Sequence, residues 1–310
     1  MDALTDVLKT LRLNTQTYFC SDFHAPWGIV MDEDSEGMFH VVLEGSCVLN
    51  ISNNSNTIIL NKGDIVAFPS GGAHWISDHQ DSPKMPSRFV LDKILSGESP
   101  FETQTEPSQE IIKNTLMCGS FSYDTKMKHP FIRDLPCFIH IKAEQNNEQR
   151  WMSELVATLS RESRSPSPGS SLMLDRLTEV LFIQIIRYFL NSQPNKHNYL
   201  AALNDQQIGT TLNLIHAEES AFWTIEKLGE KVAMSRSAFT DKFSKLVGQA
   251  PKTYLLNWRM QKAKTRLEGT DDSMYQIAED AGYSSEAAFS KAFKAFFAET
   301  PGFVRRASKY

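Results

Sequence analysis

The stretch IAEDAGYSSEAAFSKAFKAFFAETP, residues 277–301, decides the fold of the C-terminal part of this chain. Gly282 stands where a first helix must end sharply, because glycine adopts the left-handed conformation at little cost. Either Ser284 or Ser285 can then cap a second helix through its hydroxyl group. The stretch predicts a helix, a tight turn and a helix, whose second helix fits a DNA major groove. The positions expected to face inward on this second helix are Ala288, Phe289, Ala292, Phe293 and Phe296.

The same pattern occurs a second time, 50 residues earlier, in LGEKVAMSRSAFTDKFSKLVGQAP, residues 228–251. A fixed period of this kind indicates two copies of one supersecondary unit. Residues 252–268 lie between the copies and predict a helix about 25 Å long. A spacer of that length can hold two recognition helices about one turn of DNA apart. The positions that recur are Ser235, Phe239, Phe243 and Pro251, matched by Ser285, Phe289, Phe293 and Pro301.

This double unit, over residues 205–307, resembles the signature of AraC-type transcription regulators. The shared pattern is an Ile-Ala pair, Gly-aromatic-Ser, a phenylalanine, a basic residue, Phe-Lys and a closing proline. The sequence departs from it at Ala298, where glycine is usual, and at Phe303, where tyrosine is common. The resemblance implies that the chain binds double-stranded DNA and has RNA polymerase as a further partner.

The resemblance also implies that the outward positions of both recognition helices contact DNA. Asp241 can accept from a cytosine amine, and Lys291 is the best candidate for a guanine or phosphate contact. Thr253 and Arg305 are further candidates for phosphate contact. In the first helix the positions are Arg236, Ser237, Ala238, Thr240, Asp241, Lys242 and Lys245. In the second helix they are Ser285, Glu286, Ala287, Ser290, Lys291 and Lys294.

Charge and composition agree with such a protein. Of the 310 residues, 41% are hydrophobic and 22% charged, which is ordinary for a globular protein with a buried core. Residues 236–310 carry 13 Lys and Arg against 8 Asp and Glu, so this part has a net charge of +5 and the rest −10. No apolar run is long enough for a membrane helix, and the four dispersed cysteines indicate no disulfide framework. We therefore expect a cytoplasmic protein with no membrane partner.

The N-terminal half has a β-strand pattern from about residue 15 to 140, with short apolar runs between turn clusters. This pattern predicts a small antiparallel barrel or sandwich. GDIVAFPSGGAH, residues 63–74, together with FHVVLEG, residues 39–45, resembles the cupin barrel that precedes the DNA-binding domain in one AraC-type subfamily.

The resemblance to cupins suggests an effector pocket in this barrel. His74 matches the later histidine of metal-dependent cupins, but no His-x-His precedes it. His40 has the same strand parity as Val42, an apolar position that we expect to face the interior. His24, His40 and His74 can therefore converge on a divalent metal, with His40 and His74 as its candidate ligands, or on an acidic small-molecule effector, with Trp27 as an apolar wall. A pair of hydrogen-bonded core histidines is the alternative.

Residues 172–190 predict a helix with a broad apolar face that includes Leu177 and Leu181. Such a face fits a core helix or a dimerisation helix. Because it is wider than one small barrel needs, we expect a homodimer.

The sequence thus predicts an α+β multidomain protein. A cupin-like sensing domain is expected over residues 1–145, a helical linker and dimerisation region over 146–200, and an all-α domain with two helix-turn-helix motifs over 201–310. The predicted function is sequence-specific, ligand-responsive transcription regulation without enzymatic activity and without an obligatory cofactor. Two alternatives stay open: a metal-dependent cupin enzyme with an accessory DNA-binding domain, and a DNA-binding protein that takes no ligand.

Overall fold

The computed structural model describes residues 2–11, 13–32, 36–51, 57–101, 113–123, 129–143, 147–192, 198–217 and 223–308. Their contacts form two compact units, and the predicted α+β class is confirmed. The barrel unit comprises Leu13–Tyr123 and Leu135–Ser192. The helical unit comprises Met1–Arg12, Asp124–Asp134 and Gln193–Tyr310. This grouping differs from the expected divisions at residues 145 and 200, because two short N-terminal segments pack with the C-terminal helices.

Two five-stranded sheets form the barrel unit, with strand orders β1-β9-β3-β6-β10 and β5-β4-β7-β2-β8. Between the described strands, all pairings are antiparallel except that of β2 with β8. The strands are β1 (Asn14–His24), β2 (Gly28–Met31), β3 (Gly37–Glu44), β4 (Ser46–Ile51), β5 (Thr57–Asn61), β6 (Ile65–Phe68), β7 (His74–Ser77), β8 (Met85–Pro86), β9 (Lys113–Ser122) and β10 (Ile139–Ile141).

The register of the first sheet aligns His40 in β3 directly with Cys118 in β9. Neighbouring residues on adjacent strands share one face of the sheet, so both side chains enter the same interior. That interior is a hydrophobic core to which both sheets contribute, including Val42 and Leu116 from one and Leu49 and Ile76 from the other. The register therefore places a histidine and a thiol side by side among apolar side chains.

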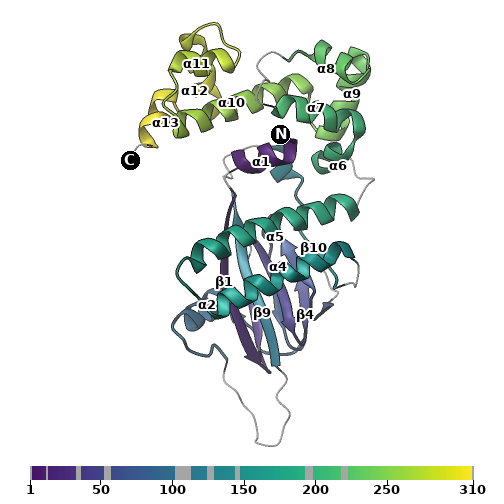
Figure 1. The fold of residues 1–310 in the computed structure, drawn as a ribbon, viewed down its shortest axis with the longest axis vertical. Helices are drawn as coiled ribbons and strands as arrows, with labels where there is room; N and C mark the ends of the chain where they lie inside the picture. Colours follow the sequence, from purple (N-terminus) through teal and green to yellow (C-terminus); the bar gives the residue numbers. More distant parts are fainter. Residues whose placement is uncertain are drawn as a thin grey trace, which may run out of the picture. The chain divides into compact units, whose positions relative to one another are not determined.

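Among the described residues, the helices of the barrel unit are α2 (Ser87–Leu95), α4 (Asn147–Arg164) and α5 (Ser170–Ser192). In Figure 1, α4 and α5 lie side by side over the sheet that contains β1 and β9, and both contact β1. Leu181 is fully buried, whereas Leu172, Met173 and Val180 of α5 are exposed. The helix therefore packs one face on the sheet and leaves an apolar stripe uncovered within this chain.

The helical unit contains ten helices among the described residues. The N-terminal helix α1 contacts α7 and α10, so it belongs to the same packed body. The helices are α1 (Ala3–Thr10), α3 (Pro130–Arg133), α6 (Tyr199–Asn204), α7 (Gln206–His216), α8 (Ile225–Lys231), α9 (Arg236–Val247), α10 (Pro251–Gly269), α11 (Met274–Asp280), α12 (Glu286–Phe297) and α13 (Pro301–Ala307). Within the described ranges, no helix combines the length and the apolar character needed to cross a membrane.

Candidate DNA interface and effector cavity

The two recognition helices, α9 and α12, begin and end in the same way. Ser235 and Ser285 are their N-caps, and each hydroxyl accepts from the backbone N–H three residues on. This confirms a serine cap for the second helix and assigns it to Ser285. The helices end at Gly248, with φ of 75°, and at Ala298, with φ of 62°.

The turn before each recognition helix also needs a left-handed residue. Gly282 has φ of 85°, as its expected role requires, and Ala233 takes the equivalent place in the first copy with φ of 54°. The backbone N–H of each bonds to the carbonyl three residues earlier. Each copy therefore has one glycine and one alanine at its two left-handed positions, in opposite order. A side chain in this conformation is strained, so Ala233 and Ala298 carry a cost that Gly248 and Gly282 avoid.

The inner faces of both helices are built from phenylalanine pairs, all four of them fully buried: Phe239 and Phe243, and Phe289 and Phe293. The expectation was wrong for Ala288, which is exposed, and for Phe296, which is 37% exposed. Phe297 packs on Phe293 instead, with ring centroids 4.6 Å apart. A helical period of 3.6 residues leaves this choice open, and packing decides it.

The outward positions expected to contact DNA fall into two groups. Thr240, Lys242 and Ser290 are half-buried. The others are exposed: Arg236, Ser237, Ala238, Asp241, Lys245, Ser285, Glu286, Ala287, Lys291 and Lys294. The structure thus brings most of these residues to the surface of the two recognition helices.

Lys242 has a structural partner within the helical unit. Its Nζ lies 2.9 Å from Oδ1 of Asp205 and 2.9 Å from Oε1 of Gln207, at the start of α7. Burial alone would raise the pKa of Asp205, but hydrogen bonds from Ile208, Lys242 and Gln207 outweigh it and lower the pKa. Lys242 therefore ties α9 to the N-terminus of α7, and its ammonium group is engaged there.

Two arginines that were expected to contact DNA also contact other groups of the protein. Arg236 pairs with Glu226 at 3.1 Å, and both side chains are well exposed, so this pair is worth little in stability. Arg305 is half-buried, and its Nη2 donates to the backbone carbonyl of Asp272 at 2.6 Å. Thr253 is exposed on α10. Arg305 thus stabilises the turn before α11 through this hydrogen bond, whereas the Thr253 side chain is exposed to solvent.

The spacer between the recognition helices is α10, which has 19 residues and is about 28 Å long. Pro251 occupies its first turn, where a missing N–H costs nothing. Tyr254 and Trp258 are buried, so both side chains anchor this helix in the core.

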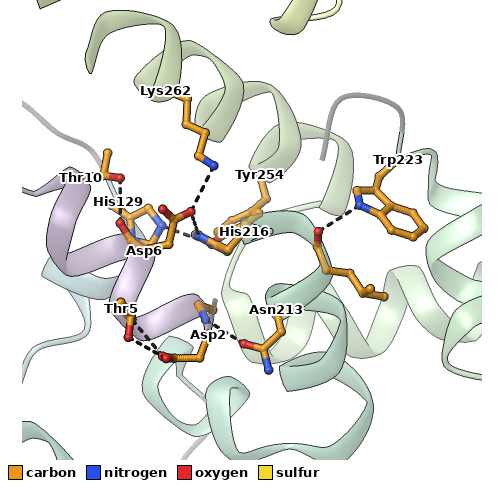
Figure 2. A network of polar contacts seen from close by, with 12 residues as sticks. Asp2, Thr5, Asp6, Thr10, His129, Asn213, His216, Trp223, Tyr254 and Lys262 are labelled. Atoms are coloured by element: carbon orange, nitrogen blue, oxygen red, sulfur yellow. Dashed lines mark hydrogen bonds and ion pairs between the residues drawn. The ribbon is translucent and has the colours of Figure 1, made fainter. Parts of the chain in front are cut away.

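A buried polar network surrounds Tyr254 within the helical unit (Figure 2). The Tyr254 hydroxyl lies 2.6 Å from Nε2 of His216, 2.9 Å from the hydroxyl of Tyr199 and 3.3 Å from Nε2 of His129. His216 Nδ1 lies 3.3 Å from a carboxylate oxygen of Asp6 in α1. Separate segments of the chain thus meet at one hydroxyl group.

The network has one consistent assignment of protons. His129 Nδ1 accepts from the Phe131 backbone N–H, so its Nε2 donates to Tyr254. The carboxylate of Asp6 only accepts, so His216 donates from Nδ1 and accepts the Tyr254 hydroxyl at Nε2. Tyr199 then donates to Tyr254. Every polar group is satisfied, which allows the network to stay buried at low cost.

The barrel unit contains a second series of buried hydrogen bonds, here called the histidine chain, which links its two sheets. His40 Nε2 lies 2.8 Å from His74 Nε2, so the two predicted histidines do meet. His74 Nδ1 donates to the Gly72 carbonyl at 2.7 Å, which leaves its Nε2 to accept from His40. His40 Nδ1 then accepts the Cys118 S–H at 3.0 Å. All four ring nitrogens are engaged.

Burial keeps the side chains of the histidine chain neutral. It lowers the pKa of His74 to about 4, and burial together with the neighbouring His74 holds the pKa of His40 well below its usual value. Burial also raises the pKa of the Cys118 thiol well above its usual value. At neutral pH the side chains of His40, His74 and Cys118 therefore carry no charge.

Beside this chain lies a cavity of about 230 Å³ between the sheets and α2. Among the residues that surround it are His40 and Cys118, both buried and here called its floor, and Leu91 of α2. The other residues that surround it are Tyr18, Phe19, Ile29, Met31, Asp32, Met38, Ser87 and Arg88.

Two of the residues expected at the pocket lie elsewhere. His24 is the exposed last residue of β1. Trp27 is fully buried against Phe23, and its indole N–H donates to Asn114 at 3.0 Å. The structure therefore does not place His24 or Trp27 at this cavity, because one lies at a strand end and the other is fixed in the core.

The geometry of the two histidines does not fit a shared metal ion. Two nitrogen ligands at about 2.0–2.1 Å from a tetrahedral zinc ion lie about 3.3 Å apart. The 2.8 Å between the Nε2 atoms of His40 and His74 is instead a hydrogen-bond distance. Within the described ranges, no group of three or more His, Cys, Asp or Glu side chains is arranged to hold a metal.

Sequence reasoning missed Cys118, the cavity residues of α2 and the network around Tyr254. Cys118 was considered only as one of four dispersed thiols, and its register with His40 follows from strand pairing. The sequence does not mark His129 and His216 as buried, because neither periodicity nor motif spacing shows which polar side chains meet in the core.

Comparison with known proteins adds to this geometry. A cupin family model matches residues 2–191, and a helix-turn-helix domain model matches residues 228–307. The HTH-type transcriptional regulator AlkR of Acinetobacter baylyi is 29% identical over 99% of this chain and 100% of its own. The regulator MtrA of Neisseria gonorrhoeae is 26% identical over 87% of this chain and 86% of its own. The C-terminal domain of the response regulator yesN of Fusobacterium nucleatum is 33% identical over 33% of this chain and 99% of that one, with a TM-score of 0.30.

Proposed function

Because the chain belongs to the AraC family of helix-turn-helix transcription regulators with an N-terminal cupin domain, we propose that a small molecule in its barrel unit controls its binding to DNA. DNA binding is the family function of the helix-turn-helix domain. The proposal has two parts. One is which residues of α9 and α12 contact DNA, and the other is that a ligand controls DNA binding.

One observation carries the proposed control by a ligand. A cavity of about 230 Å³ lies between the two sheets and α2 of the barrel unit. Folded domains pack their interiors closely, so a cavity of this size invites a ligand. The proposal excludes the alternative of a protein that takes no ligand.

The relatives do not support the enzyme alternative. AlkR and MtrA are both transcriptional regulators and align with most of this chain. We therefore propose that the cupin unit is a regulatory domain, and the proposal includes no catalytic residue.

A homodimer is a further part of the proposal. The exposed stripe of Leu172, Met173 and Val180 on α5 is an apolar surface of the kind that a second copy covers. It replaces the expected pair of Leu177 and Leu181, because Leu181 is fully buried and Leu177 half-buried. RNA polymerase stays an expected partner on the strength of the family alone.

The functional regions over residues 1–145, 146–200 and 201–310 stay predictions. The two compact units divide the chain differently, so we propose that the DNA-binding region also requires α1 and the segment that contains His129.

The test combines footprinting with a reporter. Genome-wide footprinting with the full-length protein identifies the bound sites, and a reporter driven from the strongest site is screened with small molecules. Leu91→Trp fills the cavity, and Leu95→Trp places the same side chain one turn further along α2 at an exposed position. We expect the wild type and Leu95→Trp to respond to the same compound and Leu91→Trp not to respond. An equal response in Leu91→Trp contradicts control through this cavity.

A further inference from the structure

We propose that the barrel cavity binds a small neutral molecule with an aromatic ring, and not a metal ion, an organic anion or an organic cation. This inference rests on the ligand binding proposed above and names the chemical class of the ligand.

The floor of the cavity offers no charge and no unused ring nitrogen. Cys118 donates to His40, His40 donates to His74, and His74 donates to the Gly72 carbonyl. A metal ion needs free lone pairs, and the ring lone pairs of both histidines are already accepting protons. Binding a metal here requires the chain of hydrogen bonds to break.

Part of the cavity wall is apolar and adaptable. Five of the eleven residues that surround the cavity are apolar, namely Phe19, Ile29, Met31, Met38 and Leu91. Methionine side chains adjust to irregular shapes, and their sulfur atoms make favourable contacts with aromatic rings. An engineered cavity of about 150 Å³ lined by Leu, Ile and Phe binds benzene, so the 230 Å³ here has room for a substituted ring.

The two charged residues of the lining are exposed. Asp32 and Arg88 are both exposed and have opposite charges. Water screens exposed charges, so neither group offers a desolvated opposite charge to a ligand. A charged ligand would leave water without meeting an opposite charge inside, which strongly disfavours its entry. A neutral ring loses no such hydration.

Three probes with the same ethyl-substituted ring separate these possibilities by isothermal titration calorimetry on the full-length protein at pH 7. They are 4-ethylphenol, which is neutral, 4-ethylbenzoate, an anion, and 4-ethylbenzylammonium, a cation. We expect 4-ethylphenol to bind at least tenfold more tightly than either ion. Equal or tighter binding of an ion overturns the inference, as does absence of binding by all three probes.

The matched variants locate the binding. Leu91→Trp should reduce 4-ethylphenol affinity at least tenfold, whereas Leu95→Trp should leave it unchanged. Leu91→Phe gives a second, smaller filling of the cavity and should weaken binding less than tryptophan does. If both Leu91 variants bind 4-ethylphenol as tightly as the wild type, the ligand binds elsewhere and the inference fails.

Failure of this inference can be distinguished from failure of the proposed function. If 4-ethylphenol binds with the expected preference but no compound changes expression from the reporter, the chemistry of the cavity stands and ligand control of DNA binding fails. If the reporter responds through Leu91 only to charged compounds, ligand control stands and the inference about the neutral class fails.

Discussion

A carboxylate oxygen of Asp6 in α1 lies 3.3 Å from Nδ1 of His216 in α7, although the two residues are 210 positions apart in the sequence. Lys262 of α10 lies 3.4 Å from the same carboxylate oxygen (Figure 2). Burial alone would raise the pKa of Asp6, but the hydrogen bond from His216 and the charge of Lys262 outweigh it and lower the pKa. The N-terminal helix is therefore an integral part of the helical unit.

Asp6→Ala should destabilise the full-length protein by about 2–3 kcal/mol, because it leaves the buried N–H of His216 without an acceptor. Urea unfolding followed by circular dichroism measures this change. Asp241→Ala is the control, since Asp241 is exposed on α9 of the same unit, and it should change stability by less than about 0.5 kcal/mol. Equal effects of the two substitutions would show that the contact of Asp6 with His216 contributes no stability.

The histidine chain in the barrel predicts a loss of stability in mild acid. His74 has a folded-state pKa of about 4 and an unfolded value near 6.5. The unfolded chain thus binds protons first as the pH falls, so stability is complete above pH 6.5 and declines down to about pH 4. Between pH 7 and pH 5 His74 alone accounts for about 2 kcal/mol of this loss, and His40 acts in the same direction.

Urea unfolding at both pH values checks this expectation. His74→Gln should reduce the difference between pH 7 and pH 5, whereas His79→Gln, at an exposed position, should retain the wild-type difference. A wild-type protein whose stability is the same at pH 7 and pH 5 would contradict the neutral, buried assignment.

The left-handed alanines predict an unusual pair of stabilising substitutions. Ala233→Gly and Ala298→Gly should each stabilise the protein by roughly 0.5–1 kcal/mol, because glycine relieves the strain of a positive φ. Gly282→Ala, at the matching position of the other copy, should destabilise by a similar amount or more. Thermal unfolding of the three variants measures these changes, and destabilisation by either alanine-to-glycine substitution would show that no strain is stored there.

The exposed face of α5 predicts the dimer surface. Val180→Glu should produce monomers of full stability, because Val180 is 39% exposed, whereas Leu181→Glu should unfold the barrel unit, because Leu181 is fully buried. Sedimentation velocity and circular dichroism together separate the two results. A dimeric Val180→Glu variant would place the interface on another surface.

Local patterns predicted much of this architecture. The 50-residue period, the serine caps and the buried phenylalanine pairs of α9 and α12 all follow from spacing and from capping chemistry that lie within one short stretch. The meeting of His40 with His74 followed from strand parity and a turn motif.

Contacts between distant segments could not be predicted in the same way. Cys118 joins His40 through strand register, and Lys242 meets Asp205 through the packing of α9 against α7. The choice between Phe296 and Phe297 as the inner residue depends on which neighbour each ring meets. Such outcomes are set by tertiary packing, which overrides local periodicity.

DNA affinity measured over a series of salt concentrations tests the central claim most directly. The full-length protein and its variants are titrated onto the strongest footprinted site and onto an unrelated duplex. Lys291→Ala should reduce the slope of log affinity against log salt by about 1, because Lys291 is exposed on α12 and releases a counterion. Lys242→Ala should leave the slope nearly unchanged, because its ammonium group is held by Asp205. A wild-type protein that binds its strongest site no more tightly than the unrelated duplex, or a slope that Lys291→Ala does not change, would contradict the account.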